Sequence, residues 1–515
     1  MPPLRSPAAR ALIAAAAAAL CTASPAAAQL IQIKTLPIAD GDQFQFFPSA
    51  SLGLGGVSIA LRDSLLDPFT NPAKASRLSV KTKGTFFGSP TSYSVSRNAG
   101  GGRTFPLGGI LRSGSNFGGL AVAIQEIDKI DDPNVVISPV VDLFNPDGSV
   151  LRTPSAPSRQ NRFAFGTIGH VFEGAGVSVG FSALGSSLHD IDGVELLYAG
   201  SRGVRQHGGE VDLRLGLLKE WNDGRSMEAM LLHDRFNMTQ DVSWADQFWD
   251  PNTRTFVLRE RIDHNLDHTN TWGLHLGYSQ PFADSGWRVG GIVTTNLMSH
   301  PKLPDYQIAQ VMVIPWDPGH SAAYDFGVGI AKSSGLTTFG VDAVFEPIKT
   351  HTWGEAPSPI VTDTRTLPAG SKTTENFFSF SNAILRTGLG RDIPIDTVHG
   401  ALKSIRLELG LALKSINYSL NQLDHVAESS RQQDESWMEW TRTWGFGMRF
   451  SDLELRYTGR MSTGDGRPGI QNNGGVVLAA SDAVGKNFLS APSGALSLTG
   501  VKVTTHQISV SVPIR

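Results

Sequence analysis

The sequence is poor in three features that define common classes of protein: cysteine, long apolar runs and an excess of basic charge. The only cysteine, Cys21, lies in the first thirty residues, so the remainder of the chain can form neither disulfides nor thiolate zinc sites. No later apolar run approaches the roughly 18 residues that a transmembrane helix requires. The formal net charge is −3, so nucleic acid is not expected as a partner.

The first 28 residues have the three parts of a secretory signal peptide. Arg5 and Arg10 form a basic region, an alanine-rich apolar core follows, and Ala26 and Ala28 supply a small-residue cleavage site. The core is about ten residues long, too short to span a bilayer as a helix. We therefore expect residues 1–28 to be a cleaved signal peptide; the alternative is an alanine-rich helix of a cytosolic protein.

A glycine-rich stretch, residues 51–76, looks at first like a phosphate-binding loop. The dinucleotide fingerprint G-x-G-x-x-G fails because Ser58 stands where the third glycine is required. The Walker pattern fails at Gly485-Lys486, because Asn487 follows instead of serine or threonine. An exported chain also meets little nucleotide. We therefore expect no cofactor.

Beyond residue 80 the chain is dominated by segments in which apolar and polar residues alternate. In residues 405–413 every second residue is isoleucine or leucine, and Arg406 and Glu408 stand between them. Residues 211–217 repeat the pattern. Such segments have the period of β-strands and the length, roughly 9–11 residues, of tilted membrane strands. A soluble β-sandwich would show the same alternation, so periodicity alone leaves both folds open.

The connections favour a membrane barrel, because short turns and long polar loops alternate along the chain. The short turns lie at 173–176, 222–225, 281–286, 333–335 and 451–452, and the long loops at about 128–158, 186–208, 243–267, 299–320, 354–376 and 463–500. Outer-membrane barrels have this organisation, with the short turns on the periplasmic side. We predict an all-β fold: a transmembrane antiparallel β-barrel of about sixteen strands over residues 81–515.

The stretch before the first strand, residues 49–78, resembles the N-terminal region of the FadL/PorV-like outer-membrane proteins. The matching positions are Gly53, Gly55, Gly56, Ala60, Asp63, Asp67 and the Asn71-Pro72-Ala73 element. The resemblance implies that residues 29–80 form a hatch that plugs the lumen, and that the barrel has fourteen strands, whereas the count of candidate strands is sixteen, so about 14–16 strands are expected. The chain departs from the family pattern at Pro68-Phe69-Thr70, just before the asparagine.

The residues of this segment suit a plug that packs closely against the barrel wall. Glycine lets one backbone approach another, since it has no side chain to clash. Asp63 and Asp67 are expected to pair with arginines of the lumen. Asn71-Pro72 forces an extended or turn conformation before the first strand. The alternative is a structural cap with no gating role.

Charged residues at the polar positions of the strands are expected to face the lumen. They are Asp212, Arg214, Arg406, Glu408, Lys414, Glu454 and Arg456. An open selective pore favours a ring of one sign. These charges have both signs, which predicts either paired networks that hold a plug in place or a lumen whose charges are simply satisfied. Both interpretations argue against a wide general porin.

Clusters that resemble catalytic or metal sites have simpler explanations. His264 and His268, with Asp263 and Asp267, have the spacing of a zinc pair on a helix, but they fall in a predicted external loop. The chain has no G-x-S-x-G motif, the usual signature of a serine hydrolase. We expect no metal site, no catalytic residues and no enzyme activity, and an outer-membrane hydrolase is the least favoured class.

The resemblance implies an outer-membrane channel for small hydrophobic molecules such as long-chain fatty acids. Residues 135–144 are apolar enough to capture such a ligand first. The expected partners are outer-membrane lipid, a hydrophobic small molecule and the outer-membrane assembly machinery. The chain ends in Ile514-Arg515, however, without the aromatic residue that commonly ends such barrels. The alternative is a PorV-like barrel that binds a secreted protein or scaffolds a secretion complex.

Overall fold

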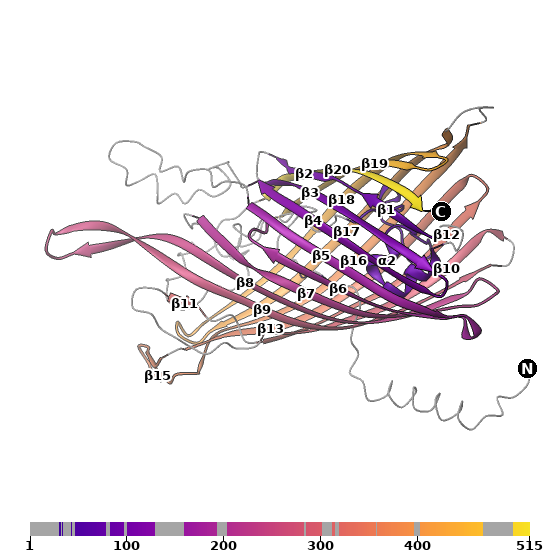
Figure 1. Ribbon diagram of the computed structural model, residues 1–515. Coiled ribbons are helices and arrows are strands. Elements are labelled where there is room, and N and C mark those ends of the chain that lie inside the picture. The colour runs from indigo at the N-terminus through magenta and orange to yellow at the C-terminus, as the bar shows by residue number, and fades with distance from the viewer. Residues whose placement is uncertain are drawn as a thin grey trace, which may run out of the picture.

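The computed structural model describes residues 30, 31, 33, 43, 47–78, 83–96, 100–128, 159–192, 203–282, 285–300, 312–314, 319–356, 358–395, 402–466 and 498–514. The predicted signal peptide and the apolar segment 135–144 lie outside these residues. The described chain forms one tilted antiparallel barrel with a short segment of helical turns inside it (Figure 1).

The described residues form a wall of sixteen strands, each paired antiparallel with its two neighbours. β1 (Gly84–Gly88) and β2 (Thr91–Val95) are halves of one interrupted strand, because both pair with β3 on one side and β20 on the other. That pairing joins the last strand to the first and closes the barrel. The other wall strands are β3 (Gly101–Ser113), β4 (Asn116–Asp128), β5 (Arg159–Phe172), β6 (Val177–Leu188), β7 (Gly203–Glu220), β8 (Ser226–Asp250), β9 (Thr255–Pro281), β10 (Trp287–His300), β12 (Gly319–Ser334), β13 (Thr337–Glu355), β16 (Lys372–Pro394), β17 (Leu402–Asp424), β18 (Ser429–Phe450), β19 (Glu454–Gly466) and β20 (Leu498–Ile514).

The remaining elements are short. Before the first strand lie η1 (Leu52–Leu54), α2 (Asp67–Thr70) and η2 (Pro72–Arg77), and η4 (Glu173–Ala175) forms the turn between β5 and β6. β14 (Ile360–Val361) and β15 (Thr366–Leu367) pair with each other, and β11 (Met312–Ile314) runs parallel to part of β9.

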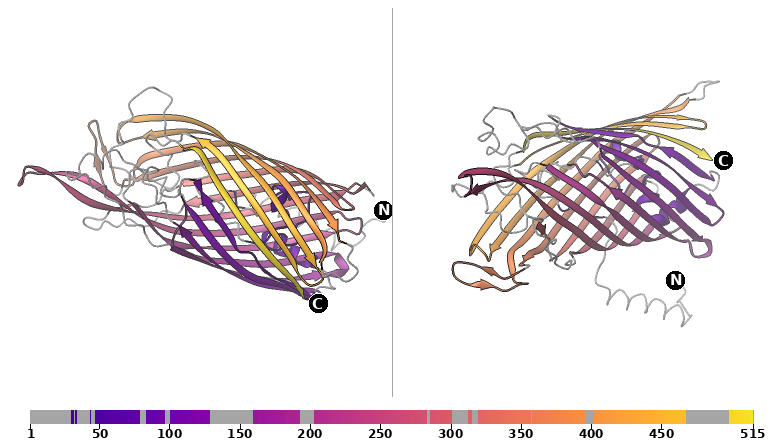
Figure 2. Two further views of the ribbon diagram at one scale, coloured as in Figure 1. Left: turned by 90° about the horizontal axis from the view of Figure 1, so that it is seen from above. Right: turned by 60° about the vertical axis from the view of Figure 1, so that its left-hand side comes forward.

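The strand number and the short turns confirm the sequence prediction, and one predicted loop is wrong. Residues 243–267 are not a loop: β8 and β9 run through them as a paired ribbon up to a tight turn at 251–254. The ribbon projects well beyond the rest of the barrel (Figures 1 and 2). Between residues 242 and 257 the chain is rich in valine, tryptophan, phenylalanine and threonine, whose high strand propensity outweighs the charges among them.

The outer face of the barrel is apolar. Leu120, Val328 and Leu409 are 75%, 66% and 65% exposed, whereas Glu408, the neighbour of Leu409 on the opposite face, is 6% exposed. A continuous apolar outer band with closed backbone pairing is what a barrel in lipid requires. The fold is therefore a transmembrane β-barrel.

The described residues include no helix that is long and apolar enough to cross a membrane.

The apolar outer band predicts a position-dependent cost of charge. Leu409→Arg places a guanidinium in the lipid-facing band and should lower the free energy of unfolding by about 2–4 kcal/mol, as arginine does near the bilayer midplane. Leu336→Arg is the matched control, because Leu336 lies in the turn between β12 and β13. Denaturant titration of the barrel in lipid vesicles measures both changes. Equal effects of the two substitutions would contradict the placement of Leu409 in lipid.

Candidate functional site

The N-terminal segment, residues 47–78, lies inside the barrel near the end that carries the short turns (Figures 1 and 2). Its first helical turn, η1, contacts β16, β17, β18 and β19, and its last, η2, contacts β4, β5, β6 and β7. The segment therefore reaches from one wall of the lumen to another. We call this end of the barrel the short-turn end and the other the long-loop end.

Asp63 holds the first half of the segment in a closed loop. Its buried carboxylate accepts hydrogen bonds from Ser49 Oγ at 2.6 Å and from the backbone N–H and hydroxyl of Ser51, both at 3.0 Å. The backbone N–H groups of Leu65 and Leu66 donate to the other oxygen, each at 3.1 Å. The expected pairing of Asp63 with a lumen arginine is therefore wrong. Donors from its own segment surround the carboxylate instead, and such bonds to a charged acceptor are strong.

Asp67 also has its partners within the segment, which corrects the second expected pairing. Lys74 Nζ lies 3.4 Å from Asp67 Oδ1, and Arg77 Nη1 lies 3.1 Å from Oδ2. The two cations continue to the wall, where Lys74 Nζ is 3.0 Å from Glu228 Oε1 and Arg77 Nε is 3.2 Å from Glu220 Oε1. Burial alone lowers the pKa of Lys74, but the carboxylates of Asp67 and Glu228 outweigh burial, and the pKa is raised. Lys74 thus stays protonated and bridges segment and wall.

The closest approach of segment and wall is a contact between two backbones. A Cβ atom on Gly410 of β17 would lie 2.1 Å from Gly55 N, closer than real atoms approach. Beside it, Thr443 Oγ1 accepts a hydrogen bond from Gly55 N and donates one to Gly53 O, both at 2.9 Å. Gly55 and Gly56 have φ values of 72° and 75°, which favour glycine. The predicted glycines therefore do lie directly against the barrel wall.

Glycines of the wall repeat this arrangement around the lumen. In each case an added Cβ would fall within 3.0 Å of an atom of the segment. These wall glycines are Gly180, Gly216, Gly290, Gly327, Gly329, Gly340, Gly388 and Gly410. The inner surface of the barrel is therefore shaped to receive the segment.

The Asn71-Pro72-Ala73 element begins η2 and fastens it to the wall. Asn71 Oδ1 accepts a hydrogen bond from Ala73 N at 3.1 Å and so caps the helical turn. Asn71 Nδ2 donates to Glu228 Oε2 at 2.9 Å. A Cβ on Gly216 would lie only 2.0 Å from Asn71 Oδ1. The asparagine thus serves both the local turn and the contact with β7 and β8.

Sequence reasoning missed two further anchors. Asp342 on β13 accepts hydrogen bonds from Ser58 N at 2.7 Å and Ile59 N at 3.1 Å. Phe69, in the triplet that departs from the family pattern, packs against Phe165 of β5 with ring centroids 5.1 Å apart. The alternation around Asp342, with apolar Val341 and Ala343 on the opposite face, was the available signal for this residue; Phe69 offered none.

Four of the predicted lumen charges form one network at the short-turn end. Arg406 Nε lies 2.5 Å from Glu408 Oε1, and Arg406 Nη1 lies 2.7 Å from Asp392 Oδ2. Arg456 Nη2 lies 2.5 Å from Glu454 Oε1, and its Nη1 lies 3.6 Å from Glu408 Oε1. Glu408 thus links the two arginines.

The other predicted lumen charges lie elsewhere on the inner face. Arg214 Nη2 is 2.5 Å from Asp212 Oδ2, and Arg214 Nη1 donates to Thr70 O at 3.1 Å. This arginine therefore does join wall and segment, although through a backbone carbonyl. Lys414 Nζ is 3.4 Å from Glu346 Oε1.

Toward the long-loop end the inner face becomes apolar. On β17 the inward positions change from charged Lys414 to Ile416, Tyr418 and Leu420, which are 0%, 3% and 0% exposed. They belong to a cluster, here the loop-side cluster, made of Ile31, Ala323, Ile348, Phe378, Phe380, Ile416, Tyr418, Leu420 and Trp437. A second cluster gathers Ala123, Phe163, Leu188, Ile191, Val204, Met238 and Val242 on the wall of β4 to β8. Sequence reasoning did not identify either.

The histidine pair suspected of metal binding lies in β9 rather than in a loop or helix. His264 Nδ1 is 2.5 Å from Asp241 Oδ1 on the neighbouring strand, and Thr269 Oγ1 donates to Asp267 Oδ1 at 2.9 Å. Within the described residues no three histidine, cysteine or acidic side chains are grouped so that they could hold a metal ion.

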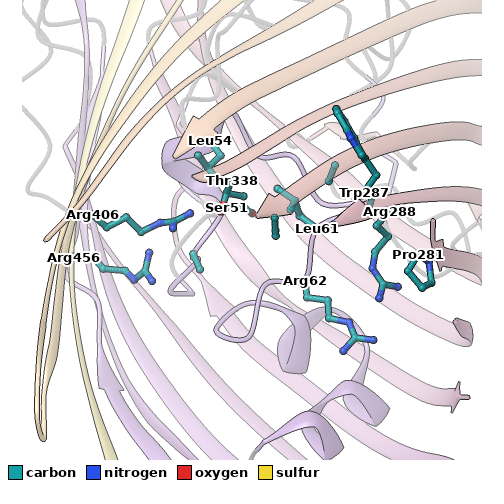
Figure 3. A pocket seen from close by; sticks show the side chains of 15 residues that line it. Ser51, Leu54, Leu61, Arg62, Pro281, Trp287, Arg288, Thr338, Arg406 and Arg456 are labelled. Atoms are coloured by element: carbon teal, nitrogen blue, oxygen red, sulfur yellow. The ribbon is translucent and has the colours of Figure 1, made fainter. Parts of the chain in front are cut away.

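A cavity of about 470 Å³ lies between the segment and the wall at the short-turn end. We call it the mouth cavity. Leu54, Leu61 and Arg62 line it from the segment, and Arg288 and Arg406 are among the wall residues that line it (Figure 3).

No protein-family model and no curated protein matches this chain. Among solved structures, a FadL homologue from Pseudomonas aeruginosa is 13% identical, with a TM-score of 0.42 over 91% of this chain and 100% of its own. The CymD monoaromatic hydrocarbon channel is 11% identical, with a TM-score of 0.35 over 92% and 99% of the two chains. The toluene transporter TodX from Pseudomonas putida is 11% identical, with a TM-score of 0.33 over 90% and 96%.

The backbone contact at Gly410 predicts that a single methyl group loosens the segment. In Gly410→Ala the new Cβ overlaps Gly55 N, and overpacking of this kind costs roughly 1–3 kcal/mol. Hydrogen exchange at residues 49–61 should therefore become about tenfold faster or more, since 1.4 kcal/mol corresponds to tenfold. Exchange in the wall strands should stay unchanged. Gly185→Ala is the control, because its added Cβ meets nothing within 4 Å; equal exchange in both variants would refute the contact.

Proposed function

We propose that this chain is an outer-membrane channel for small hydrophobic molecules, and that the N-terminal segment is the plug of its lumen. The observation that carries the proposal is the loop-side cluster, which turns large apolar side chains toward the inside of a membrane barrel. A water-filled porin has a polar interior. An apolar inner surface at the long-loop end favours a cargo that is itself apolar.

The order of the layers along the lumen suggests a route. A hydrophobic molecule that enters from the long-loop end first meets Phe378, Phe380 and Trp437, where burial gains roughly 25 cal/mol per Å² of apolar surface. It then reaches the pair Lys414–Glu346 and, beyond it, the segment. Passage requires the segment to shift, because its backbone occupies the space against the wall at Gly410.

The cargo we favour is a long-chain fatty acid or a molecule of similar character.

The charges of the inner wall support a closed lumen rather than an open pore, because they are paired with one another. The Arg406–Glu408–Arg456 network shows this pairing best. A selective ion pore needs a ring of charges of one sign. The described residues that we assigned to the lumen do not form such a ring.

A second function has one observation in its favour. The ribbon of β8 and β9 projects beyond the barrel, and Phe256, Val257 and Ile262 on it are exposed. Exposed apolar side chains on a projecting strand pair are a common basis for protein recognition. The alternative proposal is therefore a barrel that binds a secreted protein or scaffolds a secretion complex through this ribbon.

The channel proposal predicts selective permeability. Vesicles that contain the protein should take up radiolabelled oleate faster than empty vesicles, but should not swell in arabinose, because the lumen excludes a polar solute. Phe380→Asn should slow oleate uptake roughly tenfold. The substitution removes an apolar contact for the cargo, and burial of a phenylalanine side chain contributes about 1.5–3 kcal/mol. Phe256→Asn, the same change on the projecting ribbon, is the control and should leave uptake unchanged.

Rapid swelling in arabinose would identify a general pore and refute the proposal. Uptake that depends on Phe256 and not on Phe380 would favour the ribbon as the functional surface.

A further inference from the structure

The mouth cavity has a charge composition of its own. It is lined by four charged side chains, and all four are arginines: Arg62 from the segment and Arg288, Arg406 and Arg456 from the wall. Figure 3 shows Arg406 and Arg456 together on one side of the cavity and Arg62 and Arg288 on the other. Among the residues that the structure describes, no carboxylate lines the cavity. The cavity therefore presents only positive charge to whatever enters it.

The two pairs of arginines differ in how they are neutralised. Arg406 and Arg456 are each bound to carboxylates behind the cavity surface, as described above. Arg288, in contrast, donates to two neutral acceptors, Ser279 Oγ at 2.9 Å and Gly224 O at 3.0 Å. These bonds fix the direction of its guanidinium without neutralising it.

Arg62, the neighbour of Arg288, shares its carboxylate. Glu220 Oε1 lies 2.9 Å from Arg62 Nη2 and 3.2 Å from Arg77 Nε, so one acid serves two guanidiniums. Arg77 has a second carboxylate in Asp67. Within the described part of the chain, Arg62 has only Glu220 among its ion pairs, and Arg288 has none. An anion bound between Arg62 and Arg288 would supply the missing charge, and a carboxylate matches the fork of a guanidinium.

The rest of the lining is apolar apart from three hydroxyls, those of Ser51, Ser333 and Thr338. Leu54 and Leu61 project from the segment between the two arginine pairs (Figure 3), and Trp287 stands at the rim. A volume of about 470 Å³ falls within the roughly 300–1,000 Å³ of small-molecule pockets. Apolar walls with a few fixed polar groups are the usual composition of such pockets. The cavity thus has separate surfaces for an anionic head and an apolar tail.

We propose that the mouth cavity is a binding site for small anionic amphiphiles, whose carboxylate lies between Arg62 and Arg288 and whose tail lies on Leu54 and Leu61. The proposal deepens the channel function and rests on it. The site lies on the short-turn side of the segment, so a cargo that has passed the segment meets it last. The cargo class it selects is the ionised acid rather than the neutral hydrocarbon.

The test measures equilibrium binding to the full barrel in phosphatidylcholine nanodiscs at pH 7.5, with empty nanodiscs as the blank. Calorimetric titration with octanoate, 1-octanol and acetate separates head from tail. Octanoate should bind about tenfold more tightly than 1-octanol, because a hydrogen bond to a charged group is stronger than one to a neutral group. It should also bind more tightly than acetate, because only octanoate has an apolar tail to bury. Arg288→Gln should remove the preference for octanoate over 1-octanol. Arg225→Gln, in an exposed turn at the same end, is the control and should preserve it.

Arg62→Gln repeats the test from the segment, in case Arg288→Gln fails to form a barrel. Equal binding of octanoate and octanol, or of octanoate and acetate, would overturn the proposal, as would an octanoate preference that survives both substitutions. Binding and uptake fail independently. Octanoate binding that depends on Arg288, without oleate uptake, would remove the channel and keep the site, whereas uptake without the octanoate preference would remove the site alone.

Discussion

The structure depends on one close contact, the approach of the backbone at Gly55 to the wall at Gly410. Neither residue has a side chain, and a Cβ atom added at Gly410 would overlap with the Gly55 amide nitrogen. A barrel of sixteen strands is wide enough to leave a channel that its own side chains do not fill. The wall glycines let a second layer of backbone enter it, and Asp63 gives that layer its shape by gathering donors from residues 49–51 and 65–66.

Strand β17 shows how the wall combines several roles. Its inward positions carry, in order from the short-turn end, the ion pair of Arg406 and Glu408, the glycine that receives the segment, the lysine paired with Glu346, and three buried apolar residues. One strand thus contributes charged residues at the short-turn end, a backbone contact in the middle and an apolar surface at the long-loop end. The outward positions are isoleucine or leucine over residues 405–413, as lipid requires, and become serine and asparagine beside the three buried apolar residues.

Much of this could be predicted from alternation, and the rest follows from partners that alternation does not reveal. The outward leucines of residues 405–413 identify both the strand and its inward charges. The loop-side cluster was missed although the sequence carries a signal: after Lys414 the alternation changes phase, and the inward positions become Ile416, Tyr418 and Leu420. The partners of Asp63 and Asp67 were mispredicted because both carboxylates find donors within their own segment, which alternation does not reveal. Residues 243–267 were mispredicted because charged residues in a strong strand-forming sequence look like a loop.

The central claim is that the lumen holds a hydrophobic molecule above an N-terminal plug. Native mass spectrometry of the detergent-extracted barrel tests it most directly, because the mass shift reports what leaves the membrane with the protein. The account predicts a bound fatty acid or hydrocarbon that is retained at low collision energy and released before the barrel unfolds. A barrel that emerges empty, accompanied by a stoichiometric protein partner, would contradict it.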